Sequence, residues 1–271
     1  MKSWIFIICA LFATPAGAAD SVDDVRKVRL RAGAWAGSSV SLGSLSLASD
    51  SAQSEVRIDG LPSIDLGLEV WPTESVGVYW SSRIGLGADI TSQDAYLVGD
   101  PNAIGNLRGA TIAYNLHQLE AGARLRWLAG PRADAVALVW GWGARLLIQT
   151  AQDQRPSILL DRLVAGPETS LGVEWPLLRQ VWLRFSGRVG APFFVRESPN
   201  DSGDLDAFVQ FGTQAEIVLH LTSEWALQVY LDFEQTKLGF EGAGSRGAGL
   251  TNADTESQFL SSGLWARYTG L

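Results

Sequence analysis

The segment VGVYWSSRIGLGA, residues 76–88, alternates between two kinds of side chain at every second position. Its even positions are mostly large and apolar, as at Val78, Trp80 and Ile84, whereas its odd positions are small, polar or charged, as at Arg83. Successive side chains of a β-strand point to opposite faces, so this period indicates a strand with one apolar and one polar face. A helix, with its period of about 3.6 residues, would mix the two kinds.

The same alternation recurs along the chain in segments of about ten residues, the length that a tilted strand needs to cross a bilayer. Strands that alternate between lipid and lumen are typical of membrane barrels. The sequence therefore predicts an all-β fold, a transmembrane antiparallel up-and-down β-barrel of about ten strands. Eight or twelve strands remain open, because strand ends can be displaced by a few residues. The expected strands are residues 27–42, 64–70, 76–88, 119–127, 138–146, 163–175, 181–189, 209–219, 225–234 and 257–268.

The connections between these segments alternate in length. Short periplasmic turns and longer outer loops are the usual arrangement in bacterial membrane barrels, and an even strand number places both chain termini on the periplasmic side. Short turns are expected at residues 72–75, 129–134, 176–179 and 222–224. Longer polar loops are expected near residues 43–60, 89–108, 150–162, 196–206 and 239–256.

Residues 1–18 have the pattern of an export signal. Lys2 precedes an apolar run, and Ala16-Gly17-Ala18 fits the small-x-small cleavage pattern. We therefore expect residues 1–18 to be a signal peptide and residues 19–271 to form a single barrel domain. Cleavage removes Cys9, the only cysteine, so neither a disulfide nor a thiolate metal site is expected. The formal net charge of −8 argues against a nucleic-acid partner.

The C-terminal segment Ser262-Gly263-Leu264-Trp265-Ala266-Arg267-Tyr268 resembles the assembly signal of Gram-negative outer-membrane β-barrel proteins. In that signal a polar residue and a glycine precede a terminal aromatic residue, and Ser262, Gly263 and Tyr268 match these positions. The chain departs from the signal by continuing to Leu271. The resemblance implies an outer-membrane location, the barrel-assembly machinery as a partner, and contact with outer-membrane lipid and lipopolysaccharide. Other envelope proteins are a further candidate partner.

Charged residues recur at the inward positions of the predicted strands. Acids and arginines are nearly balanced there, and an isolated charge inside a narrow barrel carries a heavy desolvation cost. Ten strands also enclose much less space than the roughly 16–18 strands of porins. We therefore expect arginine–carboxylate pairs that largely occlude the lumen. The expected lumen network consists of Glu69, Arg83, Glu120, Arg124, Arg126, Arg145, Glu174, Arg184, Arg188, Glu216, Asp232, Glu234 and Arg267.

Several tryptophans lie beside the predicted short turns, where an aromatic girdle meets the membrane interface. The alternation along the strand places Trp71 at a position that faces the lumen, unless Pro72 or a bulge turns it, so the direction of its side chain stays open. The expected interface aromatics are Trp71, Trp127, Trp175 and Trp225.

These features favour a non-enzymatic barrel that serves as a structural or docking component of a cell-envelope assembly. The alternative is a narrow outer-membrane channel for small solutes, and the third reading is an outer-membrane enzyme. Ten-stranded surface proteases of the omptin type carry aspartate pairs and a His–Asp couple at the outer rim, and a lipid A hydrolase needs a serine near its histidine. This chain has only His117, expected on the lipid-facing side, and His220, near a periplasmic turn.

The predicted outer loops are acidic, with Asp89, Asp94 and Asp100 in one of them. Another, residues 197–206, contains the sequence NDSGDLD, which lacks the full spacing and the distal glutamate of an EF-hand. Solvated surface is the preferred interpretation of these acids. Divalent cations that bridge them to lipopolysaccharide phosphates are the alternative. Neither a cofactor nor a metal site is predicted.

Overall fold

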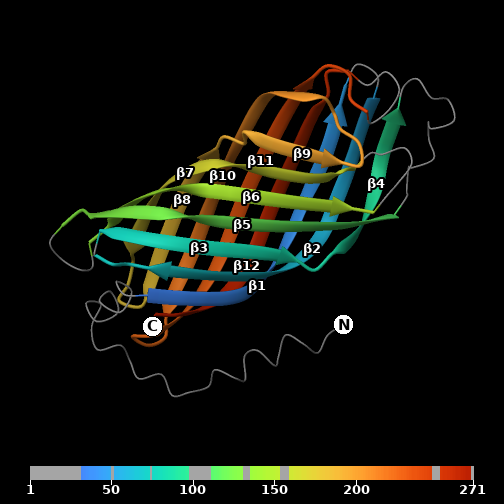
Figure 1. Cartoon of the computed structure of the whole chain (residues 1–271). Helices are drawn as coiled ribbons and strands as arrows, with labels where there is room; N and C mark the ends of the chain where they lie inside the picture. Colours follow the sequence, from blue (N-terminus) through green and yellow to red (C-terminus); the bar gives the residue numbers. More distant parts are fainter. Residues whose placement is uncertain are drawn as a thin grey trace.

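The computed structural model describes residues 32–49, 52–73, 75–97, 111–130, 135–152, 159–245 and 251–269. The predicted signal peptide, residues 1–18, lies outside these ranges. No helix within them is long and apolar enough to cross a membrane. The strands are β1 (Ala32–Ala48), β2 (Ala52–Val70), β3 (Val76–Gly85), β4 (Ala88–Leu97), β5 (Thr111–Leu128), β6 (Ala137–Ala151), β7 (Asp161–Pro176), β8 (Val181–Gly190), β9 (Phe194–Ser198), β10 (Asp204–His220), β11 (Trp225–Glu241) and β12 (Asp254–Tyr268) (Figure 1).

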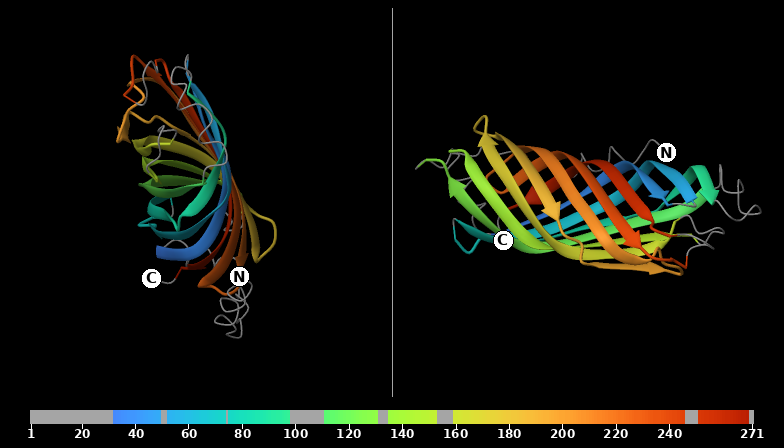
Figure 2. Two further views of the ribbon diagram at one scale, coloured as in Figure 1. Left: turned by 90° about the vertical axis from the view of Figure 1, so that its right-hand side faces the viewer. Right: turned by 90° about the horizontal axis from the view of Figure 1, so that it is seen from above.

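These strands form one antiparallel sheet that closes on itself (Figure 2). β1 pairs with β2 on one side and with β12 on the other, where Ala34 lies opposite Tyr268. β3 and β4 act as one strand, because only Leu86 and Gly87 separate them and both lie between β2 and β5. β9 likewise continues β8 beside β7. The wall is a closed ten-stranded barrel, which confirms the predicted fold.

The short turns lie where the sequence predicts them, between β2 and β3, β5 and β6, β7 and β8, and β10 and β11. Strands extend into all five of the long polar loops predicted at the other end. β1 runs to Ala48 and β2 begins at Ala52, so the loop predicted at residues 43–60 is wrong over most of its length. β4, β9 and the outer ends of β10 to β12 occupy parts of the other predicted loops. The reason is that the alternation continues there with its polarity reversed.

β1 illustrates this reversal. Nearer the short turns, Leu42 is exposed on the outer face and Ser41 is buried inside. Farther along, Leu45 and Leu47 are buried inside, and Ser46 lies on the outer face. An outward apolar face suits lipid, whereas an outward polar face suits water. The barrel therefore has a membrane half, next to the short turns, and an outer half that extends beyond the lipid.

The hydrophobic core fills the outer half of the barrel. Apolar burial stabilises a protein only where the alternative is contact with water, which holds in the outer half and not in the membrane half. We call this set of side chains the outer core. Its buried members are Leu45, Leu47, Val56, Ile58, Leu61, Ile90, Ile112, Tyr114, Leu116, Leu147, Val164, Leu238, Phe240, Ala253 and Phe259.

A β-bulge in β2 keeps the apolar residues of that strand inside. Ser41 of β1 pairs with Leu61, but the next inward residue, Gly43, pairs with Ile58, so Asp59 and Gly60 together lie opposite a single residue of β1. The extra residue changes the inward positions of β2 from odd to even numbers. If residues 58–61 alternated regularly without a bulge, the buried side chain of Ile58 would face outward.

Deletion of Gly60 is expected to leave the outer half of β2 folded, because it removes the extra residue of the bulge. Asp59 alone would then lie opposite Leu42, and Ile58 would still face inward. Deletion of Arg57, on the outer side of the bulge, is expected to disorder the outer half of β2 instead, because a shift of one residue would turn the buried Val56 to water. Amide hydrogen exchange over the outer half of β2 measures the difference. Equal exchange in the two variants would show that the alternation does not set the register of β2.

Candidate functional site in the barrel lumen

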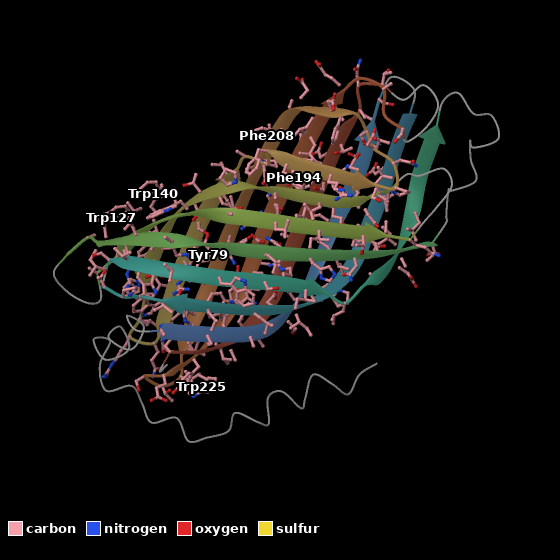
Figure 3. All side chains as sticks on the ribbon, in the orientation of Figure 1. Tyr79, Trp127, Trp140, Phe194, Phe208 and Trp225 are labelled. Atoms are coloured by element: carbon pink, nitrogen blue, oxygen red, sulfur yellow. The ribbon has the colours of Figure 1, made fainter. Side chains whose placement is uncertain are left out.

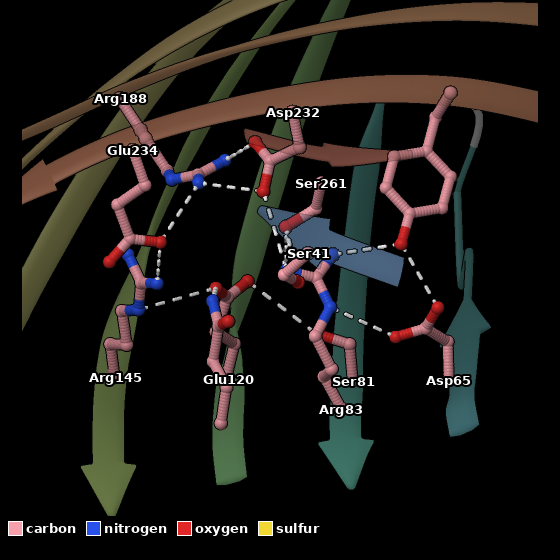
Figure 4. A network of polar contacts seen from close by, with 12 residues as sticks. Ser41, Asp65, Ser81, Arg83, Glu120, Arg145, Arg188, Asp232, Glu234 and Ser261 are labelled. Carbon is pink, nitrogen blue, oxygen red and sulfur yellow. Dashed lines mark hydrogen bonds and ion pairs between the residues drawn. The ribbon is translucent and has the colours of Figure 1, made fainter. Parts of the chain in front are cut away.

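The membrane half of the lumen is filled by charged side chains that reach across it from several strands (Figure 4). Arg83 of β3 donates from Nε to Asp65 Oδ1 at 3.0 Å and from Nη2 to the Tyr230 hydroxyl at 2.9 Å. That hydroxyl donates to Asp65 Oδ2 at 3.0 Å, and Trp265 Nε1 donates to the same oxygen at 3.1 Å. One carboxylate of β2 is thus bound by groups from β3, β11 and β12, which ties distant parts of the wall together.

Arg188 of β8 connects this group to a second one. It donates two hydrogen bonds to the Asp232 carboxylate, at 2.8 and 3.1 Å, and a third to Glu234 at 3.3 Å. Arg83 lies 3.6 Å from the same Asp232. The paired geometry at Asp232 uses the planar fork of the guanidinium, which a lysine could not reproduce.

Arg145 of β6 lies among three carboxylates. It contacts Glu234, and its nitrogens are 3.2 Å from Glu168 and 3.6 Å from Glu120. Its side chain is only 3% exposed. A buried charge needs such compensation, and here one cation serves carboxylates from β5, β7 and β11.

Toward the short turns, aromatic rings are interleaved with the charges. The Arg126 guanidinium lies 4.1 Å from the Trp71 ring centroid, and Trp71 Nε1 donates to Glu69 at 2.9 Å. Arg267 pairs with the same Glu69. Further ion pairs in this layer join Arg184 to Glu174 at 3.1 Å and to Glu216 at 3.2 Å, Arg126 to Glu174 at 3.7 Å, and Arg124 to Glu69 at 3.7 Å.

The structure brings all thirteen residues of the expected lumen network to the inside of the barrel, each in at least one ion pair. The sequence reasoning missed two inward acids, Asp65 and Glu168. With these two included, the network contains seven arginines and eight carboxylates. Asp65 shows clear inward parity between Ile64 and Leu66. Glu168 gives a weaker signal, because its outward neighbours are Pro167 and Thr169 rather than large apolar residues.

Little free space remains inside the barrel. The cavity within the charged layer has a volume of about 100 Å³, and its lining includes Asp65, Arg83, Glu120 and Arg188. This volume accommodates a few water molecules. Beyond it, the outer core occupies the lumen with buried apolar side chains. The sequence reasoning missed this core, although the alternation of Leu45 and Leu47 with serines continues the inward parity of β1.

Three of the four expected interface aromatics point outward near the short turns: Trp127, Trp175 and Trp225 are 47%, 52% and 37% exposed. Figure 3 labels Trp127 and Trp225. Trp71 does not lie with them. It is only 6% exposed and lies in the lumen, where Glu69 and Arg126 bind its ring. The expectation that it faces the interface is therefore corrected, since the turn at Pro72 does not alter its inward parity.

The C-terminal segment forms the last strand, β12, which closes the barrel against β1. Gly263 lies opposite Ser39, and the ring of Tyr268 packs 5.0 Å from that of Trp225. Ser262 lies on the outer face of the same strand. Recognition of this segment by the assembly machinery stays a prediction.

Neither histidine lies inside the outer half. His117 lies on the outward side of β5, opposite Ile84 and Ile148. His220 is buried near a short turn, with its ring 5.3 Å from that of Trp182. The His–Asp couple of an omptin-type protease lies at the outer rim, whereas His220 lies at the end of the barrel that has the short turns. Among the described residues, no group of three or more histidine, cysteine or acidic side chains is arranged to hold a metal ion.

Some of the acids at the outer rim already have protein partners. Glu197 binds Arg162 at 2.6 Å and accepts the backbone N–H of Ser202 at 2.7 Å. Asp201 accepts the backbone N–H of Ser245 at 3.1 Å. The cation-bridging alternative is untested for these residues, and Asp100 lies outside the described residues.

No protein-family model and no curated protein matches the chain. Among solved structures, the outer membrane protease OmpT from Escherichia coli is similar, with a TM-score of 0.58 and 9% identity over 89% of this chain and 97% of that one. The outer membrane protein OprG from Pseudomonas aeruginosa gives 0.42 and 11% over 88% and 96%. The outer membrane protein AlkL gives 0.38 and 12% over 94% and 93%.

At such low identity the likeness to OmpT concerns the fold. The fold is that of a Gram-negative outer-membrane β-barrel, as the sequence predicts, and the apolar outer face of the membrane half is suited to that membrane.

Proposed function

We propose that this outer-membrane barrel is a non-conducting structural or docking component of the cell envelope. The observation that carries the proposal is the filled lumen. Charged pairs occupy the membrane half and leave a cavity of only about 100 Å³ among them, and the outer core occupies the outer half. A selective channel would more often line its constriction with charges of one sign, whereas the arginines here lie among carboxylates.

The outer half supports the docking part of the proposal. It extends beyond the lipid as paired strands, and many of its outward side chains are polar. Arg57 and Asp59 form an ion pair on this face at 2.8 Å, and Lys237 and Glu256 form another at 3.0 Å. A wall built from hydrogen-bonded strands holds such groups in fixed positions, which favours recognition by a partner.

Planar-bilayer conductance distinguishes a non-conducting structural component from a narrow channel. We expect the purified barrel to show no stable open steps. Stable steps that are abolished by Arg83→Ala or Arg188→Ala would establish a conducting path through the network and overturn the proposal.

Photo-crosslinking in intact cells tests the docking part. A photoreactive residue at position 57 or 237 is expected to capture the same envelope protein, whereas one at the lipid-facing position 264 should not. Capture of lipid alone from all three positions would contradict a docking role.

A further inference from the structure

The strand pairing between β8 and β10 ends before it reaches the outer end of the barrel. The two strands pair from Val181–Leu219 up to Gly190–Gln210, and there the ladder ends. Beyond Gly190 the chain continues as β9, which pairs with β7, whereas residues 204–209 of β10 pair with β11. Within the described residues no ladder joins β9 to β10. The outer end of the seam between β8 and β10 is therefore open.

Exposed aromatic side chains lie on both sides of this opening, and Figure 3 labels two of them, Phe194 and Phe208. Phe208 lies opposite the buried Leu238 and so belongs to the inward face, yet it is 42% exposed. Phe193 and Phe194 on the other side of the opening are 74% and 46% exposed. Phe208 is exposed although it faces inward, because no strand pairs with this part of β10 on the side away from β11.

Below the opening, the outward surface of the same seam is hollow. The floor is formed by Gly187, Thr213 and Ala215, and the sides by Leu171, Phe185 and Leu231. The hollow has a volume of about 510 Å³ and lies in the apolar face of the membrane half. Small residues at outward positions create it, since the neighbouring outward positions carry large side chains.

We propose that the seam between β8 and β10 is a binding site for an acyl chain of an outer-leaflet lipid. The hollow is continuous with the surface that contacts lipid, and its lining is predominantly apolar. Toward the opening, the outward residues Val189 and Phe211 lie between the hollow and Gly190. A chain entering from the outer leaflet would pass over these two residues and lie over Gly187.

A second copy of the barrel fits this surface less well. A two-fold dimer presents the same surface on both partners, so two hollows would face each other and leave an unfilled space between them. A flexible acyl chain fills an irregular hollow without that cost. This proposal does not depend on whether the lumen conducts.

Native mass spectrometry of the full barrel, titrated with dipalmitoyl phosphatidylglycerol in mild detergent, tests the site. Gly187→Leu fills the floor, and its Cβ meets nothing nearer than Gly212 O at 4.0 Å, so the backbone accepts it. We expect this variant to bind the first lipid about tenfold more weakly than the unaltered protein. Ala121→Leu, at a small outward position on β5, is the matched control and should bind normally.

Heat-modifiable migration on gels identifies variants that fail to fold, and Ala215→Leu provides a second way to fill the hollow. Unchanged affinity in folded Gly187→Leu and Ala215→Leu would overturn the proposal. So would equal weakening by Ala121→Leu, because the lipid would then be bound without preference for the seam. A loss of dimers with unchanged lipid binding would assign the hollow to a second copy instead.

Discussion

Replacement of Arg145 with leucine is expected to lower the free energy of unfolding by about 3–5 kcal/mol, the cost of removing one partner from a buried ion pair. Arg145 is the cation shared by Glu120, Glu168 and Glu234, and its side chain is 3% exposed. Without it, three carboxylates remain close together in a lumen that excludes most water. Urea-induced unfolding of the barrel in lipid vesicles measures the loss.

Arg57→Leu is the matched control for this change. Arg57 also forms an ion pair, with Asp59 at 2.8 Å, but the two side chains are 65% and 82% exposed. Exposed pairs of this kind contribute no more than about 1 kcal/mol. Adding Glu168→Gln and Glu234→Gln to Arg145→Leu should restore part of the lost stability. Equal losses in the Arg145 and Arg57 variants would mean that the lumen network is as well hydrated as the outer wall.

Phe240→Ala is expected to destabilise the barrel by about 3–5 kcal/mol, the usual cost of truncating a buried phenylalanine. Phe240 belongs to the outer core and is 5% exposed. Because only the outer half gains stability from apolar burial, the damage should be confined there. Hydrogen exchange should accelerate in the outer parts of β1, β2 and β11 while their membrane parts stay protected.

The control for Phe240 is Phe211→Ala on β10, whose side chain is 36% exposed on the outer face of the membrane half. Lipid chains can fill the space that its ring leaves, so its loss should cost much less than that of Phe240. If both variants lost the same stability, the division of the barrel into a membrane half and an outer half would be wrong.

Together these two variants test the two layers on which the proposed function rests. The charged layer and the outer core fill the lumen by different means, and each joins strands that are distant in the chain. A lumen that is filled in both halves is what the proposed non-conducting role requires.

Much of the fold follows from the sequence because the direction of a side chain in a strand is a local property. The alternation in residues 76–88 and its repeats predict the strands, and the turn residues between them predict one end of the barrel. Inward parity also predicts the charged lining, including Arg83, Arg145 and Arg188. Each of these features depends on residues only a few positions apart.

The tertiary structure alone decided which of these side chains meet. Arg83 and Tyr230 are 147 residues apart in the chain, and their contact depends on closure of β1 against β12. The reversal of polarity beyond Leu42, the bulge at Gly60 and the open seam at Gly190 likewise depend on how the strands pair. The alternation along a strand determines which face of the wall a residue occupies. The register between strands determines its position along the barrel axis and its neighbours, and that register is fixed only when the barrel closes.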